Sequence, residues 1–119
     1  MRRDDVLLID VQQACARIEE YIEGFTRRQF LEDTKTQDAV ELQILVLGEA
    51  ASRVSQAFRD AHPDFPWRRL RELRNFYIHA YERIDAEGVW ATARGLVRRV
   101  SEGVAGLIPS QKEASDTAK

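Results

Sequence analysis

Apolar residues recur at intervals of three and four along most of the chain, which is the spacing that gives a helix one apolar face. The first such stripe is Leu7, Val11, Ala14, Ile18, Tyr21 and Phe25, and the second is Val40, Ile44, Leu47, Ala51, Val54 and Phe58. A third stripe holds Leu70, Leu73 and Tyr77, and a fourth holds Val89, Ala93, Leu96, Val100, Val104 and Leu107. The pattern predicts helices over residues 4–24, 37–61, 67–80 and 86–107.

Local signals support these boundaries. Acidic Asp4 and Asp5 suit a helix start, and Gly24 suits a helix end. Pro63 and Pro66 forbid continuation of the second helix, and Asp85 is a good N-cap for the fourth.

Gly48 lies in the middle of the second predicted helix, where glycine costs about 1 kcal/mol relative to alanine. A close approach of another helix at this point would explain that cost.

The chain shows no strand alternation and no internal repeat. Four amphipathic helices with short links predict an all-α, up-and-down four-helix bundle. One domain is expected over residues 1–108, with a short extra helical turn within residues 25–34 and a disordered tail over residues 109–119.

Composition narrows the class of protein. Apolar residues make up 44% and charged residues 32%, which is typical of a folded protein, and the net charge of −2 argues against a general nucleic-acid coat or a membrane-surface binder.

Cys15 is the only cysteine, so neither an intramolecular disulfide nor a Cys/His zinc cluster is expected, and a reducing cytoplasm fits best. No signal peptide or membrane-spanning run is expected. Arginine outnumbers lysine 15 to 3, which suits phosphate contacts but also follows from a GC-rich genome.

The segment RNFYIHAY, residues 74–81, carries the candidate chemistry. On a helix that turns ~100° per residue, Asn75 and His79 share a face that continues back through Arg71 and Arg68. Arg74 flanks this face, about 140° from His79 by the same geometry. A single rigid helix therefore does not join the tips of these two side chains, although the reach of arginine or a second copy of the chain could.

Histidine exchanges protons near neutral pH, and arginine holds phosphate oxygens. Together they suit cleavage of RNA without a metal, in which a base deprotonates the 2′-OH and a cation stabilises the crowded phosphorus. Taken alone, the spacing favours a simpler interpretation, a solvated or capping histidine near a helix C-terminus.

The same segment matches the Arg-x4-His-x-Tyr motif of HEPN-domain ribonucleases, and the chain resembles in particular the HepT toxins of HepT/MntA toxin–antitoxin pairs. The segments LGEAASRVS, HPDFPWRRLRELRN and YERIDAEGVW also resemble that family, so the resemblance spans residues 4–107. This chain has Glu72 and Leu73 where family members often have Gly-Met.

The resemblance implies a symmetric homodimer in which the motif helices of two chains face a shared cleft, and endoribonuclease activity with no cofactor or metal. It assigns Arg74 and His79 as catalytic residues and Asn75 and Tyr81 as supporting residues. Arg68 and Arg71, on the same helix face as Asn75 and His79, are further candidate RNA contacts. It also implies that a cognate nucleotidyltransferase antitoxin, using ATP and Mg²⁺, transfers AMP to Tyr81.

Other candidates are interpreted as structural. Glu49 is expected to pair with an arginine of the motif helix, His62 to cap a helix, and Trp67, Trp90 and Cys15 to pack in the core. The basic residues of the fourth helix either extend an RNA track or form a solvated face: Arg94, Arg98 and Arg99. Two further functions remain open, a non-catalytic HEPN module that binds nucleotide or RNA and docks a nucleotidyltransferase, and a dimeric helical scaffold.

Overall fold

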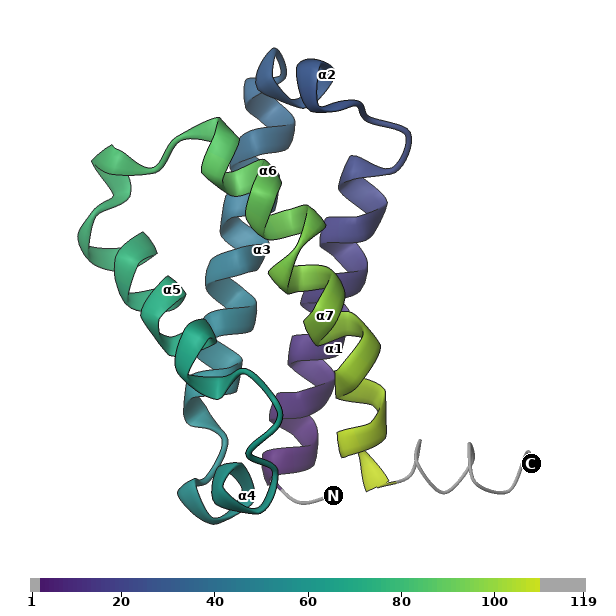
Figure 1. The fold of residues 1–119 in the computed structure, drawn as a ribbon, viewed down its shortest axis with the longest axis vertical. Coiled ribbons are helices and arrows are strands. Elements are labelled where there is room, and N and C mark those ends of the chain that lie inside the picture. The colour runs from purple at the N-terminus through teal and green to yellow at the C-terminus, as the bar shows by residue number, and fades with distance from the viewer. Residues whose placement is uncertain (1–2, 110–119) are drawn as a thin grey trace.

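The computed structural model describes residues 3–109 and is all-α over that range, which confirms the predicted fold class. The long helices α1 (Arg3–Ile22) and α3 (Thr34–Arg53) lie side by side, with α5 (Trp67–His79) against α3 and α7 (Leu96–Val104) against α1 (Figure 1). The predicted tail, residues 109–119, lies outside the described residues except for Pro109. No helix of the described range is both long and apolar enough to cross a bilayer.

The first connection contains the expected short helical turn, α2 (Arg27–Leu31). Thr26 caps it, because its hydroxyl accepts from the Gln29 amide while the Gln29 side chain accepts from the Thr26 amide. Phe30 is fully buried, and its ring centre lies 5.2 Å from that of Trp90, which holds α2 against α6 (Ala86–Arg94).

The prediction of one second helix over residues 37–61 was wrong. The chain leaves the helix at Val54, whose backbone is extended, and restarts as α4 (Gln56–Ala61). Ser55 caps α4, and both its amide and its hydroxyl donate to the Asp4 carboxylate at 2.9 and 2.7 Å. The break therefore depends on a residue 51 positions away, so the local pattern did not reveal it.

The single fourth helix was also wrong. Asp85 caps its start as predicted, with its carboxylate accepting from the Gly88 amide. The helix then breaks at Gly95, whose backbone is not helical, and gives α6 and α7, followed by the short 3-10 turn η2 (Ala105–Leu107).

The core confirms most of the predicted stripes. Fully buried members include Val11, Ile18, Ile44, Leu47, Leu70 and Val100, and Leu8 and Val97 are buried in addition. Five predicted members are only partly buried against the core: Tyr21, Phe25, Phe58, Leu73 and Leu107. Cys15 is among the buried residues, and burial, with a smaller contribution from the Glu19 charge, raises the pKa of its thiol to about 12. The thiol is therefore protonated and unreactive at neutral pH.

Candidate functional site

The motif helix α5 packs against α3 at Gly48. A Cβ added to Gly48 would lie 2.8 Å from the Cβ of Arg74 and 3.2 Å from the carbonyl oxygen of Leu70. The close helix–helix contact predicted from the mid-helix glycine is confirmed. It holds the backbone of Arg74 directly over α3.

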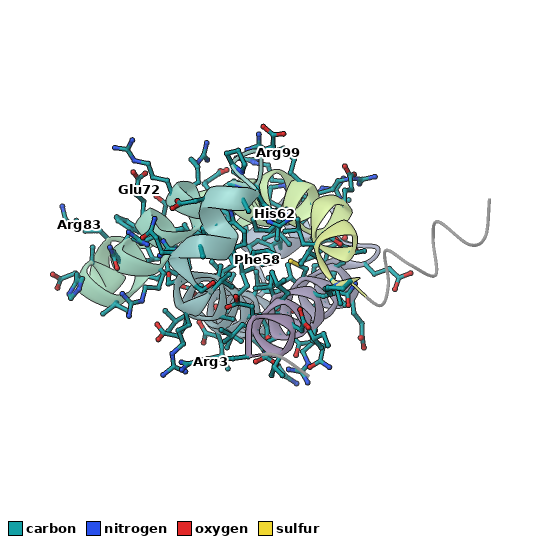
Figure 2. All side chains as sticks on the ribbon, turned by 90° about the horizontal axis from the view of Figure 1, so that it is seen from below. Arg3, Phe58, His62, Glu72, Arg83 and Arg99 are labelled. Atoms are coloured by element: carbon teal, nitrogen blue, oxygen red, sulfur yellow. The ribbon has the colours of Figure 1, made fainter. Side chains whose placement is uncertain are left out.

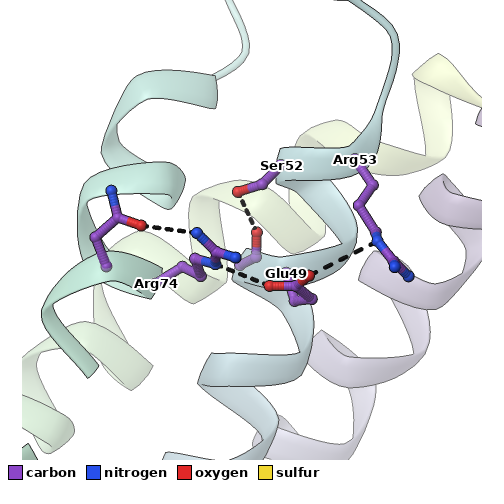
Figure 3. A network of polar contacts seen from close by, with 6 residues as sticks. Glu49, Ser52, Arg53 and Arg74 are labelled. Carbon is purple, nitrogen blue, oxygen red and sulfur yellow. Dashed lines mark hydrogen bonds and ion pairs between the residues drawn. The ribbon is translucent and has the colours of Figure 1, made fainter. Parts of the chain in front are cut away.

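The Arg74 guanidinium is fixed by two neighbours. Its Nε donates to Oε2 of Glu49 at 2.8 Å, and its Nη1 donates to Oδ1 of Asn75 at 2.9 Å (Figure 3). The Glu49 carboxylate also lies 3.7 Å from Nε of Arg53, so it sits between two arginines. The Nη2 edge of Arg74 has no carboxylate partner among the described residues.

The sequence interpretation anticipated the pairing of Glu49 with a motif-helix arginine, but it missed Arg53. The i, i+4 spacing of Glu49 and Arg53 on α3 was the available signal.

The other candidate residues lie on the exposed side of α5 and at its end. Arg74 is only partly exposed against α3, whereas four candidates are exposed: Arg68, Arg71, Asn75 and His79. His79 is the last residue of α5, and among the described residues no hydrogen bond joins its ring to Arg74 or Asn75. The described hydrogen bonds of one chain therefore join Arg74 to Asn75 but not to His79.

Tyr81 begins the 3-10 turn η1 (Tyr81–Arg83), two residues after His79. Its side chain lies outside the part of the chain that the structure describes.

An apolar groove of about 510 Å³ opens beside the Arg74–Glu49 pair. Its lining comes from three helices: Leu7, Asp10, Gln13 and Arg17 of α1, Leu45, Val46, Glu49, Ala50 and Arg53 of α3, and Ile78 of α5. Val46 and Ile78 leave 37% and 41% of their surface exposed within this groove. Sequence reasoning did not identify this groove, because it forms only when the three helices pack.

The other candidates have structural roles. The His62 ring lies 3.0 Å from the Phe58 carbonyl oxygen and stacks on the Phe58 ring, and its own carbonyl accepts from the Trp67 indole. Figure 2 shows His62 and Phe58 together beneath the bundle, viewed from the end that carries α4. Within residues 3–109, no cluster of three or more His, Cys, Asp or Glu side chains has the arrangement of a metal site.

Comparison with known proteins gives a consistent result. Residues 11–105 match the family model described as "Ribonuclease HepT-like". A "Probable ribonuclease HepT" of Thermococcus cleftensis is 36% identical over 73% of this chain and 79% of its own length. A "Putative RNase MJ0127" of Methanocaldococcus jannaschii is 34% identical over 76% of each chain. No solved structure matches the chain significantly. The extent of the family match and the identity to these relatives show that the chain belongs to the HepT-like ribonuclease family.

Proposed function

We propose that this protein is a metal-independent endoribonuclease toxin that cleaves tRNA or mRNA through Arg74 and His79. The observation that carries the proposal is the Arg74 guanidinium, which Glu49 and Asn75 hold with one edge free, in a chain of the HepT-like family. Cleavage of tRNA and mRNA transcripts by the unmodified protein in EDTA tests it. No cleavage, together with measurable affinity for nucleotides, would favour the non-catalytic binding module instead.

The proposed reaction is an internal transfer at phosphorus. The His79 imidazole takes the proton of the 2′-OH, the 2′-oxygen attacks the adjacent phosphorus, and the bond from phosphorus to the 5′-oxygen breaks. The leaving 5′-oxygen takes a proton from solvent water, and the His79 imidazolium returns its proton to solvent, which yields a 5′-OH and a cyclic phosphate. Arg74 stabilises the negative charge that develops on the phosphoryl oxygens.

A homodimer would bring His79 into reach of Arg74. The apolar groove adjoins Glu49 and ends at Ile78, one residue before His79, so a second copy seated there would place two motif helices around one cleft. The exposed aliphatic residues of the groove give this contact its apolar area.

We expect Val46→Glu to convert the dimer to monomers, because a carboxylate would be buried in the interface without a partner. Sedimentation velocity measures the change. The matched control is Phe76→Glu, which alters a residue of similar exposure, 43% against 37%, about 160° around α5 from Ile78. A monomeric wild-type protein, or loss of the dimer in both variants, contradicts the proposed interface.

Glu49 is proposed as a positioning residue for Arg74. Glu49→Ala is expected to lower the cleavage rate roughly tenfold, because Arg74 loses the acceptor of its Nε–H. Glu49→Gln keeps an oxygen acceptor and should retain most of the activity.

The control for Glu49 is Glu72→Ala, which removes the exposed carboxylate that pairs with Arg68 at 3.1 Å. Single-turnover cleavage in EDTA gives the rates. Equal rates for Glu49→Ala and Glu72→Ala would remove Glu49 from the mechanism.

Neutralisation is proposed to occur by transfer of AMP from ATP to the Tyr81 hydroxyl, catalysed by a partner nucleotidyltransferase with Mg²⁺. An adenylate two residues from His79 adds bulk and negative charge beside an RNA cleft.

Intact mass spectrometry after co-expression with that partner should show one or more added adenylates, and Tyr81→Phe should remove them. Tyr21→Phe is the control, because Tyr21 is partly buried against the core on α1. An unchanged mass excludes the modification but leaves the nuclease proposal intact.

A further inference from the structure

A second hollow, of about 490 Å³, lies between α5 and the junction of α6 with α7. Four arginines line it, Arg69 from α5, Arg94 from α6, and Arg98 and Arg99 from α7, and we refer to it as the arginine hollow. Glu102 is the one carboxylate of its lining. The hollow is thus locally basic although the whole chain carries a net charge of −2.

The positive charge of the arginine hollow is only partly balanced by carboxylates. Several exposed arginines elsewhere pair with a glutamate one helical turn away, as in Arg28–Glu32, Arg53–Glu49 and Arg68–Glu72. In the hollow only Arg98 has such a partner, Glu102 at 3.3 Å.

Arg69, Arg94 and Arg99 form no ion pair with any carboxylate of residues 3–109. Unbalanced positive charge of this kind favours binding of an anion from outside.

The local backbone supports such a ligand. The Arg94 guanidinium lies 5.4 Å from the centre of the Trp90 ring, which limits its freedom. Helix α7 begins at Leu96, directly after Gly95, and no side chain caps its first amides. These amides add partial positive charge at the same junction, next to guanidinium groups that grip phosphate oxygens in pairs.

The arginine hollow lies away from the apolar groove. The groove is formed by α1, α3 and the Ile78 side of α5, whereas the hollow is formed by α5, α6 and α7. Figure 2 shows Arg99 on the opposite side of the molecule from Arg3 of α1. A dimer that closes over the groove therefore leaves the hollow open to solvent.

We infer that the arginine hollow binds the phosphodiester backbone of the RNA substrate at a distance from the cleavage site. This inference rests on the proposed function, because it assigns a second contact to the same substrate. Helix α5 connects the two sites, with Arg69 on the flank towards the hollow and Arg74 about 140° around the helix. RNA held at both sites would pass along the exposed face of α5.

Binding to a fluorescein-labelled single-stranded RNA of about 20 nucleotides tests the inference separately from cleavage. All proteins carry His79→Ala so that the RNA stays intact, and anisotropy is measured over a range of salt concentrations. The test variant adds Arg69→Ala and Arg99→Ala. The control adds Arg3→Ala and Arg28→Ala, which remove the same charge from two other exposed arginines.

The test variant is expected to bind RNA roughly tenfold more weakly than its parent, and its salt slope should fall by about 1.4 for two lost phosphate contacts. The control should change affinity by less than about twofold, as expected for arginines outside the RNA path. Because all four arginines are exposed, thermal melting should show both variants folded.

Equal affinities for the two double variants overturn the inference, and so does a complete lack of RNA binding by the parent. If the test variant loses affinity only for a protein partner, the hollow is a protein-docking surface and the RNA assignment is wrong. Loss of RNA affinity without any cleavage by the wild-type protein supports the hollow and contradicts the proposed catalysis. If the wild-type protein cleaves RNA but both double variants keep the affinity of the parent, the proposed catalysis is supported and the RNA contact at the hollow is contradicted.

Discussion

His79→Ala is expected to abolish RNA cleavage, with the single-turnover rate in EDTA falling by roughly 10²–10⁴-fold, the usual contribution of a general base. His79 is exposed at the end of α5, where a substrate can reach it, and no described hydrogen bond holds its ring in a structural role. The loss should appear in the rate at saturating protein, because the imidazole acts on the reacting proton and not on RNA affinity.

The matched control is His62→Gln, which alters the other histidine of the chain. The His62 ring caps α4 at the Phe58 carbonyl, so its replacement should lower the melting temperature somewhat and leave the cleavage rate near wild type. Full activity of His79→Ala would remove the imidazole from the mechanism. Equal losses in both variants would point to unfolding.

Gly48→Ala is expected to lower the free energy of unfolding by about 1–2 kcal/mol. The added methyl group would lie 2.8 Å from the Arg74 Cβ, close to the backbone, where a change of rotamer cannot relieve the clash. Overpacking of this kind typically costs about 1–3 kcal/mol, and the better helix propensity of alanine returns up to about 1 kcal/mol. Urea unfolding followed by circular dichroism measures the difference.

Gly103→Ala is the control for Gly48→Ala. A Cβ at Gly103 in α7 would lie 3.7 Å from the Phe65 ring, an ordinary van der Waals distance, so only the gain in helix propensity remains. We expect Gly103→Ala to be neutral or stabilising by up to about 1 kcal/mol. A stabilised Gly48→Ala would show that α3 and α5 are not in close contact.

The fold was predictable as far as it depends on local pattern. Most stripe residues of α1, α3, α5 and α7 are buried as predicted, and Gly24 has a positive φ of 78° just after α1 ends. The two helix breaks were not predictable in this way. Apolar spacing continues through both Val54 and Gly95, while the first break is held by the Asp4 contact from the other end of the chain.

The candidate site shows the same division. Gly48 and Glu49 could be connected to the motif helix from the sequence, because a mid-helix glycine and a carboxylate on a packed face each require a partner. The apolar groove was not predictable, because it collects side chains from three helices that are far apart in the sequence. For the arginine hollow, the sequence grouped Arg94, Arg98 and Arg99 but did not place Arg69 of α5 beside them. Their residues look like an ordinary solvated face when each helix is considered alone.

The most direct test of the central claim, that the His79 imidazole and the Arg74 guanidinium act on one ribose–phosphate linkage, is to map the RNA ends left by the unmodified protein in EDTA. We expect a 5′-OH on one fragment and a cyclic or terminal phosphate on the other, and no cut at a position whose 2′-OH is replaced by hydrogen. Fragments with a 5′-phosphate and a 3′-OH, or cleavage at the 2′-deoxy position, would contradict it.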